Sequence, residues 1–193
     1  MPDLGLYQGK YALRRLLDRI PGIARFEPNA VSMSSLVPSL VAGVSLALGW
    51  WPLAILGIAG RMVLTTLDGH IAENYGKKTR IGGYVNRVPA ELGDVMILLG
   101  LWTRADPAWG TLVIAGAWLV NVFGVLGLAA GGSTQSVGPA GQTDRLALLV
   151  LASALAIVVP IDWTIVCQIL VALIALTVAL RIRRTVRELV RPA

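Results

Sequence analysis

The chain has 193 residues, of which 55% are hydrophobic and only 15% are charged, and its mean hydropathy is +0.70. A globule of 20.5 kDa has too much surface for its volume to hide this excess of apolar side chains. The composition therefore excludes an ordinary soluble enzyme and a disordered tail, and the single cysteine, Cys167, excludes an intrachain disulfide scaffold. The class that remains is a polytopic membrane protein.

Six apolar stretches are long enough to cross a membrane, and in lipid they must be helices, because an unpaired strand would leave backbone polar groups unsatisfied. They cover residues 30–50, 52–73, 85–103, 110–131, 144–160 and 162–182. Proline, glycine and short polar segments separate them. The sequence thus predicts an all-α fold in which residues 1–193 form one membrane domain with six transmembrane helices.

An amphipathic segment precedes the first apolar stretch. Its apolar face is formed by Leu13, Leu16, Leu17 and Ile20, and its basic face by Arg14, Arg15 and Arg19. This pattern predicts an interfacial helix over residues 5–20 that lies on the inner leaflet. An anchoring role and a substrate-gating role are both compatible with it.

Basic and aromatic residues indicate the orientation. With a cytoplasmic N-terminus, every lysine and arginine except Arg61 and Arg104 falls on the cytoplasmic side, as the positive-inside rule requires. Tryptophans then gather at the outer boundary and tyrosines at the inner one. We expect both termini in the cytoplasm and the chain in the cytoplasmic membrane. The net charge of +6 reflects this topology and attraction to anionic lipid, and we expect no nucleic-acid partner.

Polar residues inside the apolar stretches cluster at one end of two of them. Arg61, Thr65 and Asp68 share a helical face at spacings i, i+4 and i+7, and Asn86 and Asp94 lie on one face of the next stretch. The short connection predicts antiparallel neighbours whose polar faces meet at the cytoplasmic mouth. Charged groups inside a membrane are costly and usually mark function. Arg61 either neutralises Asp68 or contacts a ligand, and Asp94 either supports the site or pairs helices.

Residues 65–90 have the length and register of the signature D-x2-D-G-x2-A-R-x8-G-x3-D-x3-D, which Asp68, Gly69, Ala72 and Gly82 match. Three more segments resemble patterns that accompany this signature. Thr79-Arg80-Ile81-Gly82 resembles T-R-x-G, Pro28-Asn29-Ala30-Val31-Ser32 resembles P-N-x-x-T, and Gly141-Gln142-Thr143-Asp144-Arg145 resembles G-K-x-D-R. Over essentially its whole length the chain therefore resembles the CDP-alcohol phosphotransferase family, also called the CDP-alcohol phosphatidyltransferase family. The resemblance implies six spans with a short amphipathic N-terminal helix.

The resemblance also implies an activity. A substituted phosphate moves from a CDP-linked lipid to an alcohol and CMP is released, with the four signature aspartates holding divalent metal ions. Such ions prefer oxygen ligands and stabilise the charge that develops between nucleophile and leaving group. Here Thr65, Asn86 and Ala90 replace three of the aspartates, and Glu73 replaces the signature arginine.

Candidate site residues follow from this alignment. As metal ligands we expect Asp68, Thr65 and Asn86, holding Mg²⁺ or Mn²⁺ in fewer than two sites if the protein is active. As the base we expect Glu91, next to Ala90, or His70, the only histidine. As nucleotide- and lipid-binding residues we expect Gly69, Ala72, Arg80, Gly82, Asp144 and Arg145. Asn121 is expected to form an interhelical hydrogen bond.

Three functions are compatible with these residues. The first is a divergent phosphotransferase of phospholipid synthesis. The second is a non-catalytic family member that binds lipid or scaffolds another membrane protein. The third, a small transporter or channel, is disfavoured because the polar groups lie at one end only and no inverted repeat is visible. For the first two we expect membrane lipids, a CDP-linked lipid and a second copy of the chain as partners.

Overall fold

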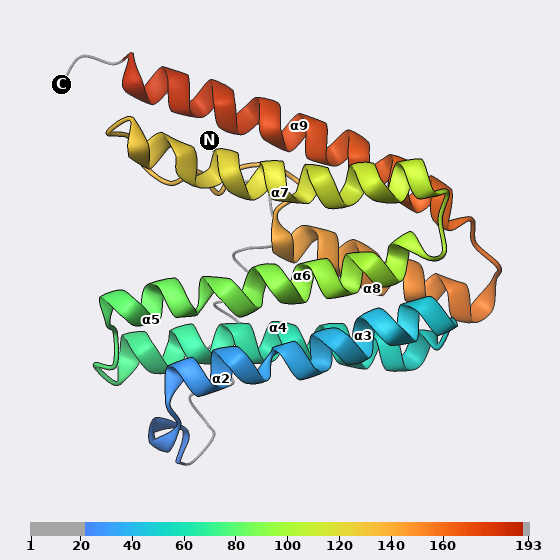
Figure 1. The fold of residues 1–193 in the computed structure, drawn as a ribbon, viewed down its shortest axis with the longest axis horizontal. Coiled ribbons are helices and arrows are strands. Elements are labelled where there is room, and N and C mark those ends of the chain that lie inside the picture. Colours follow the sequence, from blue (N-terminus) through green and yellow to red (C-terminus); the bar gives the residue numbers. More distant parts are fainter. Residues whose placement is uncertain (1–21, 191–193) are drawn as a thin grey trace.

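The computed structural model describes residues 22–190, and every regular element in that part of the chain is helical (Figure 1). The elements are a 3-10 turn, η2 (Ile23–Arg25), followed by α2 (Pro28–Ser34), α3 (Leu36–Leu48), α4 (Trp51–Asn74), α5 (Arg80–Val85), α6 (Arg87–Trp102), α7 (Pro107–Ala129), α8 (Gln142–Val158) and α9 (Trp163–Leu189). The all-α prediction is confirmed for these residues. The interfacial helix predicted for residues 5–20 lies outside them.

Each predicted span overlaps one long helix or, for residues 30–50, the pair α2 and α3; the span 85–103 corresponds to α6, and α5 precedes it. α2 and α3 follow one another through Ser35, and α5 and α6 follow one another through Asn86, and both junction residues have right-handed helical backbone angles. Within the described residues, four helical segments are long and apolar enough to cross a membrane: Pro28–Leu48, Trp51–Asn74, Pro107–Ala129 and Trp163–Leu189. α6 with 16 residues and α8 with 17 are shorter. Six crossings therefore stay a prediction.

Local chemistry explains where the helices begin and end. Gly49 ends α3 with a φ of 76°, a left-handed conformation that glycine adopts without steric cost. Asp106 caps α7 by accepting hydrogen bonds from the backbone N–H groups of Ala108 (3.0 Å) and Trp109 (3.3 Å). Asp162 caps α9 in the same way through Thr164 (2.8 Å). The breaks that the sequence predicted are therefore real helix termini.

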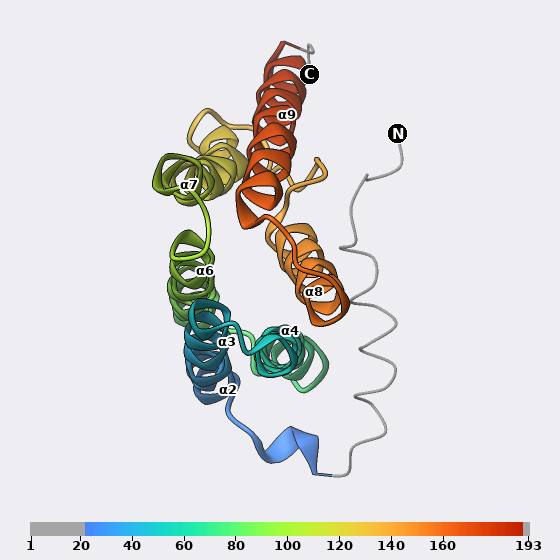
Figure 2. The same ribbon diagram turned by 90° about the vertical axis from the view of Figure 1, so that its right-hand side faces the viewer.

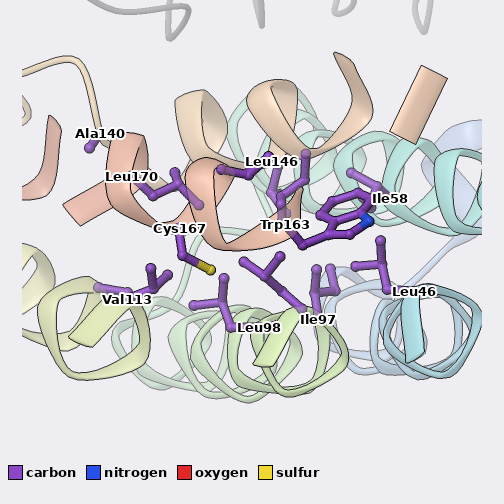
Figure 3. Packing of buried hydrophobic residues seen from close by; sticks show 14 of the residues in the cluster. Leu46, Ile58, Ile97, Leu98, Val113, Ala140, Leu146, Trp163, Cys167 and Leu170 are labelled. Atoms are coloured by element: carbon purple, nitrogen blue, oxygen red, sulfur yellow. The ribbon is translucent and has the colours of Figure 1, made fainter. Parts of the chain in front are cut away.

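The helices pack around a large apolar core, and a smaller apolar cluster of Ile23, Val31 and Ile71 joins η2, α2 and α4. α3 lies against α4 and α6, α8 lies against α4, and α7 lies against α9 (Figure 2). Figure 3 shows side chains from these helices meeting in the core, among them Leu46, Ile58, Leu98, Val113, Leu146, Cys167 and Leu170. The outward faces are also apolar, since Leu56 is 67% exposed and Leu151 is 70% exposed. Apolar faces directed outward identify an integral membrane protein.

Two glycines allow α3 and α6 to approach closely. A Cβ added to Gly100 would collide with the carbonyl group of Gly43, and a Cβ added to Gly43 would collide with the carbonyl oxygen of Met96. Small residues at such crossings permit the backbone contact that drives helix association in lipid. The α3–α6 contact therefore depends on the absence of both side chains.

We expect Gly100→Ala to destabilise the fold by about 1–3 kcal/mol, because the new methyl group would force the two backbones apart. Thermal unfolding in detergent micelles measures the effect. Gly83→Ala is the matched control, since Gly83 is also a helical glycine but an added Cβ there has no neighbour within 4 Å. Equal melting temperatures for the two variants would contradict the proposed role of the α3–α6 contact.

Candidate functional site

The signature residues stand on helices that end or begin at one end of the bundle. α4 ends there, α5 and α6 begin there, and α2 packs against both α4 and α5 (Figure 1). The predicted meeting of the two polar faces stays a prediction, since α4 and α6 pack on α3 rather than on each other.

Asp68 lies in the part of α4 that packs against α2. Its carboxylate is buried, with the residue 1% exposed. Oδ2 accepts a hydrogen bond from Ser32 Oγ of α2 at 2.5 Å, and Oδ1 accepts one from the backbone N–H of Gly69 at 2.5 Å. Hydrogen bonds to a charged acceptor are the strong ones in proteins. Asp68 thus holds α2 against α4, and joins two segments that are 36 residues apart.

Gly82 lies beside the start of α2. Thr79 caps α5 by accepting a hydrogen bond from the backbone N–H of Gly82 at 2.9 Å. A Cβ on Gly82 would lie 2.8 Å from Thr79 Oγ1 and 3.3 Å from Asn29 Oδ1. Glycine at this position therefore leaves room for the side chains of Thr79 and Asn29. Arg80, in the first turn of α5, is exposed.

Thr65 and Asn86 complete the expected ligand set. Thr65 Oγ1 donates to the carbonyl oxygen of Arg61 at 3.0 Å, so its proton is used within α4. Asn86 is half-buried between α5 and α6. Gly69 and Ala72 are half-buried on α4.

A second polar cluster joins α4, α6 and α8. Arg61, which is 1% exposed, donates from Nη2 to the carbonyl oxygen of Ala90 at 2.5 Å. The same oxygen accepts a hydrogen bond from Gln142 Nε2 at 3.0 Å. Arg61 therefore reaches across to α6, and three helices meet at the residue that replaces the last signature aspartate.

The ion pair next to this cluster is buried. Arg145 Nη2 and Asp94 Oδ2 are 2.6 Å apart, and their side chains are 0% and 4% exposed. Arg145 Nη1 also donates to the carbonyl oxygen of Ala140 at 2.8 Å. Of the two roles expected for Asp94, the structure shows helix pairing. The ligand-binding role expected for Arg145 stays a prediction.

The two candidate bases lie in different surroundings. Glu91 is half-buried, and its Oε2 accepts a hydrogen bond from Asn121 Nδ2 of α7 at 2.6 Å, which confirms that Asn121 bonds between helices. His70 is buried, with Asn74 Nδ2 3.2 Å from its Nδ1 and the ring of Tyr75 edge-on at 6.4 Å. Their catalytic roles stay predictions.

Asp144 lies in the first turn of α8 and caps that helix. Its Oδ2 accepts a hydrogen bond from the backbone N–H of Gly141 at 3.1 Å, which stabilises the first turn. Sequence reasoning gave no role to the hydroxyl of Ser32 or the amide of Gln142. Ser32 and Gln142 both lie in short segments that resemble segments of the family. Their place in those segments was the only indication in the sequence that they belong to the site.

The comparison of the sequence with known families decides the lineage. Residues 25–185 match the CDP-alcohol phosphatidyltransferase profile. The chain belongs to the CDP-alcohol phosphatidyltransferase family. The resemblance derived from residues 65–90 and its flanking segments is thereby confirmed.

Curated relatives and a solved structure agree with this family. The chain is 27% identical over 128 residues to archaetidylinositol phosphate synthase of Pyrococcus horikoshii, covering 65% of this chain and 68% of the relative. It is 26% identical over 123 residues to inner membrane protein YnbA of Escherichia coli, covering 61% of each. The fold is similar to that of Mycobacterium tuberculosis phosphatidylinositol phosphate synthase (PgsA1) with CDP-DAG bound, at a TM-score of 0.73 and 15% identity over 96% of this chain and 98% of the other.

Family members generally use divalent metal ions, and the residues of this chain do not fit a metal pair. The four signature positions offer one carboxylate, Asp68, beside a hydroxyl, an amide and a methyl group. In residues 22–190 no three histidine, cysteine, aspartate or glutamate side chains are grouped so that they could hold a metal ion. Two divalent ions need several anionic oxygens to offset their charge. Chemistry that depends on a metal pair is therefore not supported by this donor set.

Proposed function

We propose that this CDP-alcohol phosphatidyltransferase family member binds a CDP-linked lipid where α2, α4 and α5 meet, and that it serves phospholipid synthesis as a binding protein rather than through two-metal transfer. One observation carries the proposal. The Asp68–Ser32 hydrogen bond holds α2 against α4, whereas three of the four carboxylates for a metal pair are absent. The solved neighbour with CDP-DAG bound supports the ligand class.

The surroundings of the site suit a phosphate-bearing lipid. Arg80 and Lys78 are exposed at this end, and Lys77 lies close by in an ion pair with Glu27 at 2.9 Å. Arginine binds phosphate oxygens in a planar, two-pronged geometry. Gly69, Ala72 and Gly82, as the family resemblance implies, belong to the proposed binding set. Asp144 and Arg145 complete the proposed binding set.

We also propose six membrane crossings, with the interfacial helix of residues 5–20 and both termini on the cytoplasmic side of the cytoplasmic membrane. The exposed cations Lys78, Arg80 and Arg87 stand at the site end of the bundle. The other end carries tryptophans: Trp51 and Trp163 stack with ring centroids 4.9 Å apart. Exposed cations at one end of the bundle and tryptophans at the other support an orientation with the site end in the cytoplasm.

A second copy of the chain is the proposed partner within the membrane. Ala172, Ala175 and Ala179 form an exposed face of small residues on α9, and such faces suit contact between helices. A different membrane protein scaffolded by this chain is the other proposed partner.

Transfer itself is a second candidate. Glu91 keeps a carboxylate one residue away from the replaced fourth aspartate, and Asn121 holds it in place. In that case Glu91 or His70 would take the proton of the acceptor alcohol, with CMP as the leaving group.

Radiolabelled CDP-diacylglycerol distinguishes the two candidates. We expect the purified protein to bind it, Asp68→Ala to weaken binding at least about tenfold, and no CMP to be released with any of a panel of alcohols. Asp106→Asn, at the far end of the bundle, is the control, and thermal unfolding of both variants checks that they are folded. CMP release that disappears in Asp68→Ala would establish transfer instead. Absence of binding to the folded wild-type protein would reject both candidates.

A further inference from the structure

Arg61 places a positive charge beside the signature positions. It shares a face of α4 with Thr65 and Asp68, and its guanidinium group ends at the carbonyl oxygen of Ala90. Gln142 of α8 donates to the same oxygen. One carbonyl group therefore connects three helices at the position where the family signature has its last carboxylate.

The interior of the protein has space reserved for this guanidinium group. A Cβ on Gly93 would lie 2.8 Å from Arg61 Nε and 2.5 Å from Ser39 Oγ, so any larger residue at position 93 would displace the arginine. Arg61 is 1% exposed. The charge is thus held by packing in one place and cannot reach water by turning outward.

Other ionisable groups lie near Arg61. Glu91 and Asp94 are the anions that act on Arg61, and Arg145, paired with Asp94, is the neighbouring cation. Two cations face two anions in a region of low dielectric, where unlike charges attract strongly and like charges repel strongly. A divalent ion bound among the signature positions would add two positive charges next to a fixed arginine, with Asp68 as the single signature carboxylate to offset them.

We propose that Arg61 takes the place of a divalent metal ion at this site. Its guanidinium group joins α4 to α6, supplies the fixed positive charge, and makes the fold and the site independent of metal. Only the identity of the ligand rests on the proposed function. The metal independence rests on the Arg61, Gly93 and Ala90 contacts.

The first test is thermal unfolding of the purified wild-type protein with EDTA or with millimolar Mn²⁺. We expect the two melting temperatures to agree within about 1 °C. A metal ion that binds the folded protein, present at a concentration a hundred times its Kd, would raise the melting temperature by roughly 5 °C or more. A rise of that size in wild type, lost in Asp68→Asn, would overturn the proposal. Arg61→Met is expected to lower the melting temperature equally with EDTA and Mn²⁺, and Arg61→Lys is expected to restore part of the loss.

A second test rebuilds the signature. One variant carries Thr65→Asp, Asn86→Asp and Ala90→Asp with Arg61 retained, and a matched variant adds Arg61→Met. We expect Mn²⁺ to stabilise only the variant without the arginine, and equal stabilisation of both would overturn the proposal. If the rebuilt variants do not fold, the wild-type comparison decides alone.

Measurement of CDP-diacylglycerol binding separates this inference from the proposed function. Equal binding with EDTA and Mn²⁺ supports both. Binding that appears only with Mn²⁺ overturns the metal independence and leaves the proposed ligand intact. Absence of binding under both conditions rejects the proposed ligand, while the unfolding experiments still decide the role of Arg61.

Discussion

Replacing Arg145 with methionine is expected to destabilise the fold by about 3–5 kcal/mol, because it leaves the buried carboxylate of Asp94 without its partner. The two side chains are 2.6 Å apart and almost fully inaccessible, so water cannot solvate the remaining charge. The variant also removes the hydrogen bond to the carbonyl oxygen of Ala140 at the start of α8. Thermal and denaturant unfolding in micelles measure the loss. Arg183→Met, on an exposed position of α9, serves as the control and is expected to change stability little.

A double variant separates the ion pair from its other roles. Asp94→Val with Arg145→Met removes both charges, and we expect it to recover most of the lost stability, since apolar residues often replace a buried ion pair without cost. If the stable double variant fails to bind CDP-diacylglycerol, the ion pair also supports ligand binding, the function that the family resemblance implies for Arg145. A double variant no more stable than Arg145→Met would contradict the ion-pair explanation.

Helix positions could be predicted from the sequence because their signals are local. Proline, glycine and capping aspartates mark the ends of the helices within a few residues, and Gly49, Asp106 and Asp162 act in the structure as such residues usually do. The arrangement of the site was predictable only in part. The short connection places the end of α4 and the start of α6 at one end of the bundle, but the two helices are not packed neighbours: α4 packs on α3, α8 and α2, and α6 packs on α3 and α7. The side chain of Arg61 joins them by donating to the carbonyl oxygen of Ala90.

The partners of the buried charges could not be read from the sequence. Asp68 is the carboxylate nearest to Arg61 on its own helix face, but the structure shows Arg61 bonded to a backbone carbonyl of α6, and a carbonyl acceptor has no sequence signature. The pairing of Asp94 with Arg145 joins residues 51 positions apart and depends on how α8 packs in the bundle. Such contacts follow from tertiary geometry, which local patterns do not contain.

Arg181 of α9 is another buried charge whose partners are backbone carbonyl groups. Its hydrogen bonds hold the connection between α7 and α8 in place. Nη1 donates to the carbonyl oxygen of Val120 at 2.5 Å, and Nε donates to that of Val137 at 3.1 Å. Gly124 faces the guanidinium group, and a Cβ there would lie 2.5 Å from Nη1. Four residues earlier, Thr177 accepts a hydrogen bond from the backbone N–H of Ala140 at 2.9 Å. The 130–141 connection is therefore held against α9 by these contacts. It leads into α8, where Gln142 donates to the carbonyl oxygen of Ala90.

We expect Arg181→Met to destabilise the fold by about 3–5 kcal/mol, since two hydrogen bonds from a charged donor are lost and each contributes about 1.5–3 kcal/mol. The 130–141 connection should become cleavable by protease, and binding of CDP-diacylglycerol should weaken because Gln142 loses its fixed position. Arg181→Lys keeps the charge but can reach only one of the two acceptors, so an intermediate loss is expected. Arg187→Met, on an exposed position of the same helix, is the control. Protection of the connection from protease in a destabilised Arg181→Met variant would show that other contacts hold it.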